Sequence, residues 1–201
     1  SAIGQVLTYN RLNSDIIPTD GYKLWLNTEV AGLGGDAKYV SGKTGFSYYY
    51  PLAKDVTLNA LGEVGAIAAY SDADVEINER YFLGSRTLRG FESGGLGPRD
   101  IATDDALGGN TFYRGSLEAG FPLGLPDEIG VKGFAFSDFG SVFDVDETGA
   151  GIADSGSLRA SVGVGLGWQS PLGPLRVDFA KAFLKEDYDE EEVFRFDFGT
   201  R

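Results

Sequence analysis

Short segments with a period of two dominate the hydrophobic pattern of the chain. Every second residue from Leu158 to Trp168 is apolar, and the residues between them are polar or glycine. The same alternation occurs over 56–70 and over 22–30. Since successive side chains of a β-strand point to opposite faces, each segment is expected to form a strand with one apolar and one polar face.

Similar segments predict about nine strands in all. The expected ranges are 4–12, 22–30, 37–50, 56–70, 110–121, 129–143, 158–169, 174–184 and 193–201. Short, proline-marked turns are expected at 18–21, 51–55, 122–127 and 171–174, and the longer connections are 71–110, 144–157 and 185–192. Short turns at one end and long loops at the other are typical of an outer-membrane barrel, with the short turns on the periplasmic side.

A soluble β-sandwich would show the same alternation of apolar and polar residues. Its polar face would carry more Lys and Glu, whereas here the polar positions are rich in Gly, Ser and isolated charges, which suits the crowded lumen of a barrel. No window reaches the roughly 18 apolar residues of a membrane-spanning helix. We therefore predict an all-β fold, a transmembrane antiparallel up-and-down β-barrel with about eight or nine strands in this chain.

The absence of two residue types excludes several kinds of catalytic and metal-binding site. The chain has no Cys and no His, so thiol nucleophiles, zinc–thiolate sites and the commonest general base are absent. The net charge of -13 argues against nucleic acid as a partner. The acidic runs at 71–76, 144–147 and 186–192 lack the pattern of an EF-hand and are interpreted as solvated loops, although carboxylates at alternate positions can suit Ca²⁺. We expect no enzyme activity, no cofactor and no metal.

One connection is far longer than joining two strands requires. Residues 71–110 span about 40 positions, and long ordered loops usually have a function. Within them, residues 81–91 are unusually apolar and aromatic for a stretch that faces solvent. This part of the loop is expected to pack against another part of the molecule.

The loop contains Leu88-Arg89-Gly90-Phe91, which resembles the VRGF/Y motif in the sixth extracellular loop of the BamA superfamily (bacterial surface antigen D15), with Leu in place of Val. Segments 105–110, 116–118, 136–140 and 170–175 resemble further landmarks of that family, in the same order. The resemblance covers essentially the whole chain. Segment 105–110 favours BamA over its TamA and two-partner secretion relatives.

The resemblance implies that the loop folds back into the lumen, where Arg89 meets Asp138 with Glu118 beside it. An arginine in a lumen needs a carboxylate, and its planar fork can bond one bidentately. Glu118 lies on the polar face of its strand, at alternate positions with Arg114 and Ser116. The strand of Asp138 is less regular, because Phe134 and Phe136 share the parity of the aspartate.

The last strand carries Phe194, Phe196 and Phe198 on the face expected to meet lipid, and Gly199 with its polar neighbours on the other. It resembles the C-terminal β-signal that assembly machines recognise, without the customary final aromatic residue. We expect truncation or a disordered terminus there, and we expect this strand to form one side of a seam.

By resemblance, residues 1–201 are the C-terminal portion of a sixteen-stranded outer-membrane β-barrel domain with an inserted extracellular loop at 71–110, and the POTRA domains and N-terminal strands are missing. The implied function is non-enzymatic assembly and insertion of β-barrel proteins into the bacterial outer membrane, by strand augmentation at a lateral seam. The implied partners are outer-membrane lipids, unfolded outer-membrane clients and Bam-type accessory lipoproteins.

Two other functions remain open from the sequence. One is a polypeptide secretion pore of the same superfamily, TamA-like or of the two-partner type. The other is a barrel enzyme acting on carbohydrate or phospholipid, for which no activated nucleophile is evident without His. Because an isolated half-barrel exposes two sheet edges, it is expected to self-associate or to pair with the missing N-terminal half.

Overall fold

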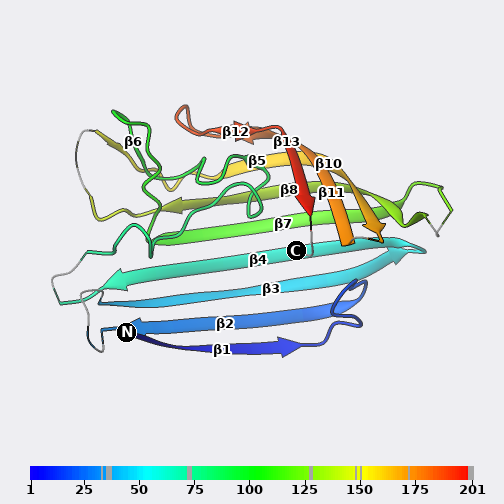
Figure 1. The fold of residues 1–201 in the computed structure, drawn as a ribbon, viewed down its shortest axis with the longest axis horizontal. Coiled ribbons are helices and arrows are strands. Elements are labelled where there is room, and N and C mark those ends of the chain that lie inside the picture. Colours follow the sequence, from blue (N-terminus) through cyan, green and yellow to red (C-terminus); the bar gives the residue numbers. More distant parts are fainter. Residues whose placement is uncertain are drawn as a thin grey trace.

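A single antiparallel sheet of nine strands forms most of the described chain in the computed structural model (Figure 1). The structure describes residues 1–32, 34, 38–71, 74–126, 129–147, 149, 151–171 and 173–198. In spatial order the strands are β1 (Ala2–Asn10), β2 (Gly21–Ala31), β3 (Tyr39–Ala53), β4 (Val56–Ala69), β7 (Thr111–Pro122), β8 (Val131–Phe143), β10 (Arg159–Ser170), β11 (Gly173–Leu184) and β13 (Phe194–Phe198). The predicted all-β, antiparallel, up-and-down arrangement is confirmed.

The sheet is open within the described residues, because β1 and β13 form its two edges and do not pair with each other. Figure 1 shows the sheet curling, so that β10, β11 and β13 run at a steep angle to β1–β4. The edge strand β13 is short and pairs with β11 only from Leu175–Phe198 to Phe179–Phe194.

The predicted turn at 51–55 is wrong in extent. β3 continues to Ala53, with an irregularity in its register between Pro51 and Ala53, and only Lys54 and Asp55 form the turn. The last pair between β2 and β3 is Gly21–Tyr49, so Pro51 has no neighbour on that side of the ladder. A proline is tolerated there because a backbone N–H at this position would have no hydrogen-bond partner.

The predicted turn at 18–21 is also too short, because β1 ends at Asn10 and the connection covers 11–20. The side-chain oxygen of Asn13 accepts hydrogen bonds from the backbone N–H groups of Thr19 (3.0 Å) and Asp20 (3.2 Å), and Asn10 accepts one from Leu12 N–H (2.9 Å). Asparagine side chains that bond nearby backbone in this way end strands and hold turns.

The outer face of the sheet is apolar and exposed, as the alternation predicts. In β10, Val162, Val164 and Leu166 point outward, and Val164 is 59% exposed. Exposed aromatic residues lie near the short-turn end of the sheet: Tyr9, Tyr22, Tyr48, Tyr50 and Trp168. An apolar face of this extent is expected to contact something other than water. Among the described residues, no helix is long and apolar enough to cross a membrane.

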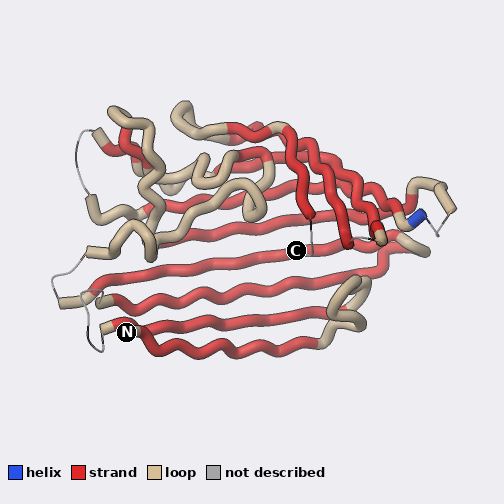
Figure 2. The backbone as a smooth tube through the Cα atoms, viewed as in Figure 1, coloured by secondary structure: helices blue, strands red, loops and turns tan. Residues whose placement is uncertain are grey.

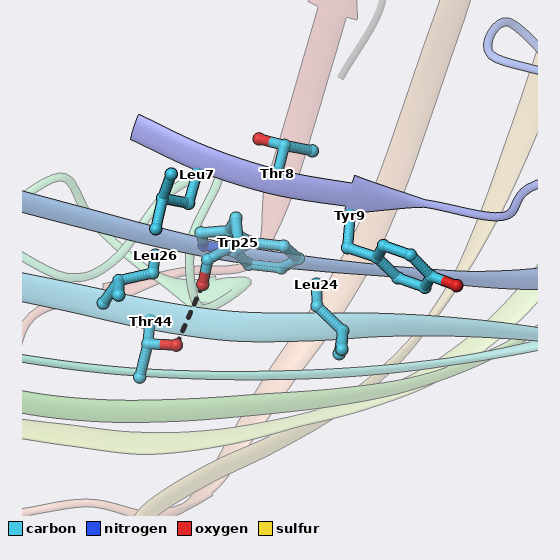
Figure 3. Close-up of a pocket in the computed structure, with 7 residues that line it drawn as sticks. All are labelled: Leu7, Thr8, Tyr9, Leu24, Trp25, Leu26 and Thr44. Carbon is cyan, nitrogen blue, oxygen red and sulfur yellow. Dashed lines mark hydrogen bonds between the residues drawn. The ribbon is translucent and has the colours of Figure 1, made fainter. Parts of the chain in front are cut away.

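The β1 edge is the most open part of the sheet, since all nine residues of β1 are exposed. Leu7 pairs with Leu26 and Tyr9 pairs with Leu24, and these four side chains line a shallow hollow (Figure 3). The backbone of β1 has a strand neighbour on one side only within the described residues.

The long connections gather at one end of the sheet (Figure 2). They contain four two-residue strands that the alternation pattern does not reveal. β5 (Gly90–Phe91) pairs with β12 (Glu191–Glu192), and β6 (Arg99–Asp100) pairs with β9 (Ile152–Ala153). Loop 71–110 is thereby tied to both of the other long connections.

The largest buried apolar cluster lies between loop 71–110 and the inner face of the sheet. The loop contributes four side chains and strands β7, β8 and β11 contribute the rest: Leu83, Leu88, Leu96 and Phe91, with Phe112, Val142 and Ala182. Leu88 and Phe91 are fully buried. The loop is therefore part of the core and not a surface appendage.

We predict that Val164→Arg lowers the free energy of unfolding by about 2–4 kcal/mol, because an arginine near the midplane of a bilayer costs that much on the lipid face of a barrel. Denaturant titration of the protein folded into lipid vesicles measures the difference. Thr103→Arg, at an exposed loop position, is the matched control. Equal stability of the two variants would mean that the outer face of β10 does not contact lipid.

Candidate functional site

A tight turn positions the motif residues. The carbonyl oxygen of Gly84 accepts hydrogen bonds from Thr87 N–H (3.0 Å) and Thr87 Oγ1 (2.8 Å), and Ser85 N–H donates to Phe91 O (2.7 Å). Gly84 has φ of 114°, and a Cβ there would lie 1.8 Å from the carbonyl oxygen of Glu92. The turn directs the side chains of Leu88 and Phe91 into the core and leaves Arg89 facing the sheet.

Arg89 lies at the centre of the candidate site and is 2% exposed. Its Nε and Nη2 donate to the two carboxylate oxygens of Asp138 at 2.6 and 2.7 Å, and its Nη1 donates to Glu118 Oε2 at 2.5 Å. The backbone of Arg89 is held as well, since its N–H donates to Asp138 (3.1 Å) and its carbonyl accepts from Ser161 Oγ (2.5 Å). The structure thus brings together the three residues that the resemblance placed side by side.

This environment keeps the guanidinium charged. Burial alone lowers the pKa of Arg89, but the hydrogen bond to Asp138 and the charges of Asp138 and Glu118 outweigh it and raise the pKa above its usual value. A buried charge persists only when it is paired and hydrogen-bonded, and here the pairing is bidentate.

Two inward-facing phenylalanines explain the irregular pattern of β8. The Cζ atom of Arg89 lies 3.3 Å from the ring centroid of Phe136, and the Cζ atom of Arg176 lies 4.3 Å from that of Phe134. Aromatic faces attract guanidinium groups, most strongly where water is excluded. Both rings therefore belong on the inner, polar face of β8 together with Asp138. Two aromatic residues on this face are consistent with its assignment as the polar face.

Arg176 extends the network along β11. It donates to both oxygens of Glu118, at 3.1 Å from Nη1 and 2.7 Å from Nη2, and its Nε bonds Asp178 at 2.9 Å. Asp138, Glu118 and Asp178 thus alternate with two arginines across β7, β8 and β11. The loop supplies one of the two cations through Arg89.

A second ionic group anchors the loop from the other side. Arg114 on β7 pairs with Glu63 on β4 (2.7 Å) and donates to the carbonyl oxygen of Thr87 in the loop (3.2 Å). Trp25 Nε1 donates to Glu63 at 3.2 Å, which explains why a tryptophan lies on the polar face of β2. The loop is therefore bonded to a second arginine-carboxylate pair, which links β7 to β4.

Gly90 must approach the sheet closely. Its φ is 93°, and a Cβ at this position would lie 3.0 Å from Ser161 Cβ and 3.5 Å from Ala180 Cβ. Both the backbone conformation and the space select glycine.

Three further arginines hold the long connections together away from the motif. Arg80 pairs with Glu147 (2.7 Å), Arg99 with Glu190 (3.0 Å) and Arg159 with Asp189 (3.0 Å). The hydrogen bond from Arg80 holds the pKa of Glu147 below its usual value. Each pair joins two different connections or a strand end to a connection, so the described parts of the three connections are linked to one another.

The side chains of the last strand point in the directions that the sequence predicts. Phe194, Phe196 and Phe198 are each more than half exposed on the outer face. Arg195 and Asp197 point inward and bond each other at 2.5 Å. Gly199 lies outside the described residues.

Sequence reasoning did not identify Arg176, Asp178 and Ser161 as parts of this site. Arg176 and Asp178 lie at alternate positions of one strand, but which acid an arginine meets depends on the register between strands, which the sequence does not contain. Among the described residues, no group of three or more acidic side chains is arranged to hold a metal ion.

We predict that Arg89→Lys destabilises the docked loop by about 3–5 kcal/mol, because a lysine cannot reproduce the bidentate bond and leaves buried carboxylates under-paired. Protease sensitivity of loop 71–110 in folded protein reports the loss. Arg11→Lys, which changes a more exposed arginine bonded to Tyr9, is the control. If the Arg89 and Arg11 variants resist protease equally, the buried pair does not hold the loop.

Gly90→Ala is expected to cost at least about 1–2 kcal/mol, because a side chain at positive φ is strained and the new Cβ crowds Ser161. Gly42→Ala, where a Cβ meets nothing within 4 Å, should be close to neutral. Denaturant midpoints of the two variants in the same lipid make the comparison. A Gly90→Ala midpoint that matches that of Gly42→Ala would show that the loop does not approach the sheet as closely as described.

Comparison with known proteins agrees with this geometry. The chain is 38% identical over 198 residues to the outer membrane protein assembly factor BamA of Neorickettsia risticii, covering 98% of this chain and 26% of that protein. It is 30% identical over 136 residues to the sorting and assembly machinery component 50 homolog of Mus musculus, covering 67% of this chain and 28% of that protein. The chain thus spans about a quarter of the length of these relatives.

The crystal structure of BamA from Haemophilus ducreyi lacking POTRA domains 1–3 has a similar fold. Its TM-score is 0.86 at 29% sequence identity, over 97% of this chain and 41% of that one. The Omp85 superfamily domain matches residues 1–201 without remainder. The chain therefore belongs to the Omp85 superfamily.

Proposed function

We propose that this chain is the seam-bearing part of a non-enzymatic factor that inserts β-barrel proteins into a bacterial outer membrane. The observation that carries the proposal is the edge strand β13. It makes a short ladder with β11 and has no strand on its other side within the described residues. An unpaired strand edge is a template for another strand.

The outer face supports insertion into lipid. Exposed apolar side chains cover it on both edge strands, including Leu7 and Ile3 on β1 and Phe196 on β13. A client strand that pairs with β13 therefore places its own apolar side chains beside the apolar side chains of this chain that face lipid. No nucleotide is required, because burial of the client in lipid supplies the free energy.

The relatives' names bear on the place of action. One is named an outer membrane protein assembly factor and another a sorting and assembly machinery component, and an outer membrane is the place of action that we propose for this chain. We propose the bacterial one, on the higher identity and coverage of the bacterial relative. Outer-membrane lipids, unfolded barrel clients and Bam-type accessory lipoproteins are the proposed partners, together with N-terminal strands that complete the barrel.

Loop 71–110 has a bracing role in this proposal. Through Arg89 it joins β7 and β8, and through Ser161 it reaches β10. An open sheet with two free edges bends easily, and a rigid insert on its inner face resists that bending. The strand pairing at the seam can then change while the neighbouring strands keep their positions.

A cysteine cross-link tests the seam directly, and the chain has no native Cys to interfere. Phe196→Cys on β13 should form a mixed disulfide with a client that carries one cysteine in its terminal strand, because opposed residues of paired strands have Cβ atoms about 5 Å apart. The measurement is the yield of the adduct during assembly in proteoliposomes.

Val164→Cys is the matched control, since Val164 and Phe196 are similarly exposed (59% and 56%) but Val164 lies on β10, which has neighbours on both sides. Equal yields at the two positions, or complete assembly of the client without an adduct at Phe196→Cys, would contradict the proposal. The alternative, a secretion pore, predicts a conductance that rises when 71–110 is deleted and a substrate that crosses the bilayer without inserting.

A further inference from the structure

We infer that Ser85 and Arg86 form a latch that positions the edge strand β13, so that the inserted loop controls how readily this strand leaves its place. The contacts of Arg89 tie the loop to the body of the sheet. The Ser85-Arg86 contacts are separate from them and reach the seam strand itself. This inference concerns the position of β13 and does not depend on which substrate the seam accepts.

The latch consists of two contacts to inward-facing residues of β13. Arg86 Nε donates to Asp197 Oδ1 at 2.9 Å, and Arg195 donates to the hydroxyl oxygen of Ser85. Arg195 also pairs with Asp197, so the two residues of the strand and the two of the loop form one connected group. The carboxylate of Asp197 is 10% exposed and receives both arginines.

The loop holds these two residues in an unusual conformation. Ser85 has φ of 53°, in the left-handed region, directly after Gly84 at 114°. A residue with a side chain rarely adopts this conformation unless its surroundings fix it. The hydrogen bonds between Gly84 and Thr87 and from Ser85 N–H to Phe91 O fix it here, and they aim Ser85 and Arg86 at β13.

The position of β13 depends on this latch because its own ladder is short. The chain before the strand turns inward, where β12 pairs with β5 and Glu92 N–H donates to Glu190 O (3.0 Å). The loop therefore holds the segment entering β13, and the latch holds its middle. Within the described residues, β11 is the only strand that pairs with β13.

Amide hydrogen exchange of the natural full-length protein in lipid bilayers tests the latch. Arg86→Ala should raise exchange over 194–198 by roughly two- to five-fold, as expected for loss of a partly exposed ion pair. Exchange over 131–143 in β8 should not change, because the Arg86 side chain pairs with Asp197 on β13. Arg86 has a 64% exposed side chain, so its removal leaves the core intact.

A double-mutant comparison separates the latch from a general loosening. If Arg86 acts through Asp197, Arg86→Ala should have little further effect in an Asp197→Asn background, since interacting residues are not additive. Arg86→Lys should restore most of the protection. Lys54→Glu, in a distant exposed turn, makes a larger change of net charge and should leave 194–198 unaffected.

Three results would overturn the latch. They are unchanged exchange over 194–198 in Arg86→Ala, an equal rise across all strands, and an undiminished effect of Arg86→Ala in the Asp197→Asn background. Heat-modifiable gel migration of each variant identifies any that fails to fold. In that case Arg86→Gln, which removes the charge and keeps most of the side chain, replaces Arg86→Ala with the same expected result.

Discussion

The bidentate bond between Arg89 and Asp138 is the interaction on which most of the structure depends. It places a charge from the loop against β8, and Glu118 on β7 completes its coordination. Removal of one partner from a buried pair leaves an uncompensated charge, which costs several kcal/mol. The apolar cluster around Leu88 and Phe91 forms only if the loop is docked, so ionic and hydrophobic contacts of the loop stabilise each other.

This arrangement divides the sheet into a braced region and a free one. Strands β2, β3, β4, β7, β8, β10 and β11 contact the loop or the residues that hold it. β1 pairs only with β2 within the described residues, and all of its residues are exposed. β13 is intermediate, with a short ladder and two side-chain contacts to the loop. The proposed function at the edges thus depends on rigidity at the centre of the sheet.

The sequence was sufficient for the nine strands of the main sheet, because alternation of side chains reports directly which face is apolar. Strand ends were less predictable, as at Pro51, where tolerance depends on how far the neighbouring strand extends. The placement of Arg89 near Asp138 and Glu118 came from a motif, since no periodic signal in a loop reports its distant contacts. Arg176 and the β5–β12 pair were missed because register and loop geometry arise only when the chain folds.

The central claim is that the loop is part of the folded core while the protein lies in a membrane. Amide hydrogen exchange of the unmodified protein in lipid bilayers tests it most directly, by comparing residues 88–91 with strand β8 and with the exposed turn at 101–105. We predict that 88–91 exchange as slowly as 136–140 in β8 and much more slowly than 101–105. Exchange of 88–91 at the rate of 101–105 would contradict the account, because it would mean that Arg89 is not held by Asp138.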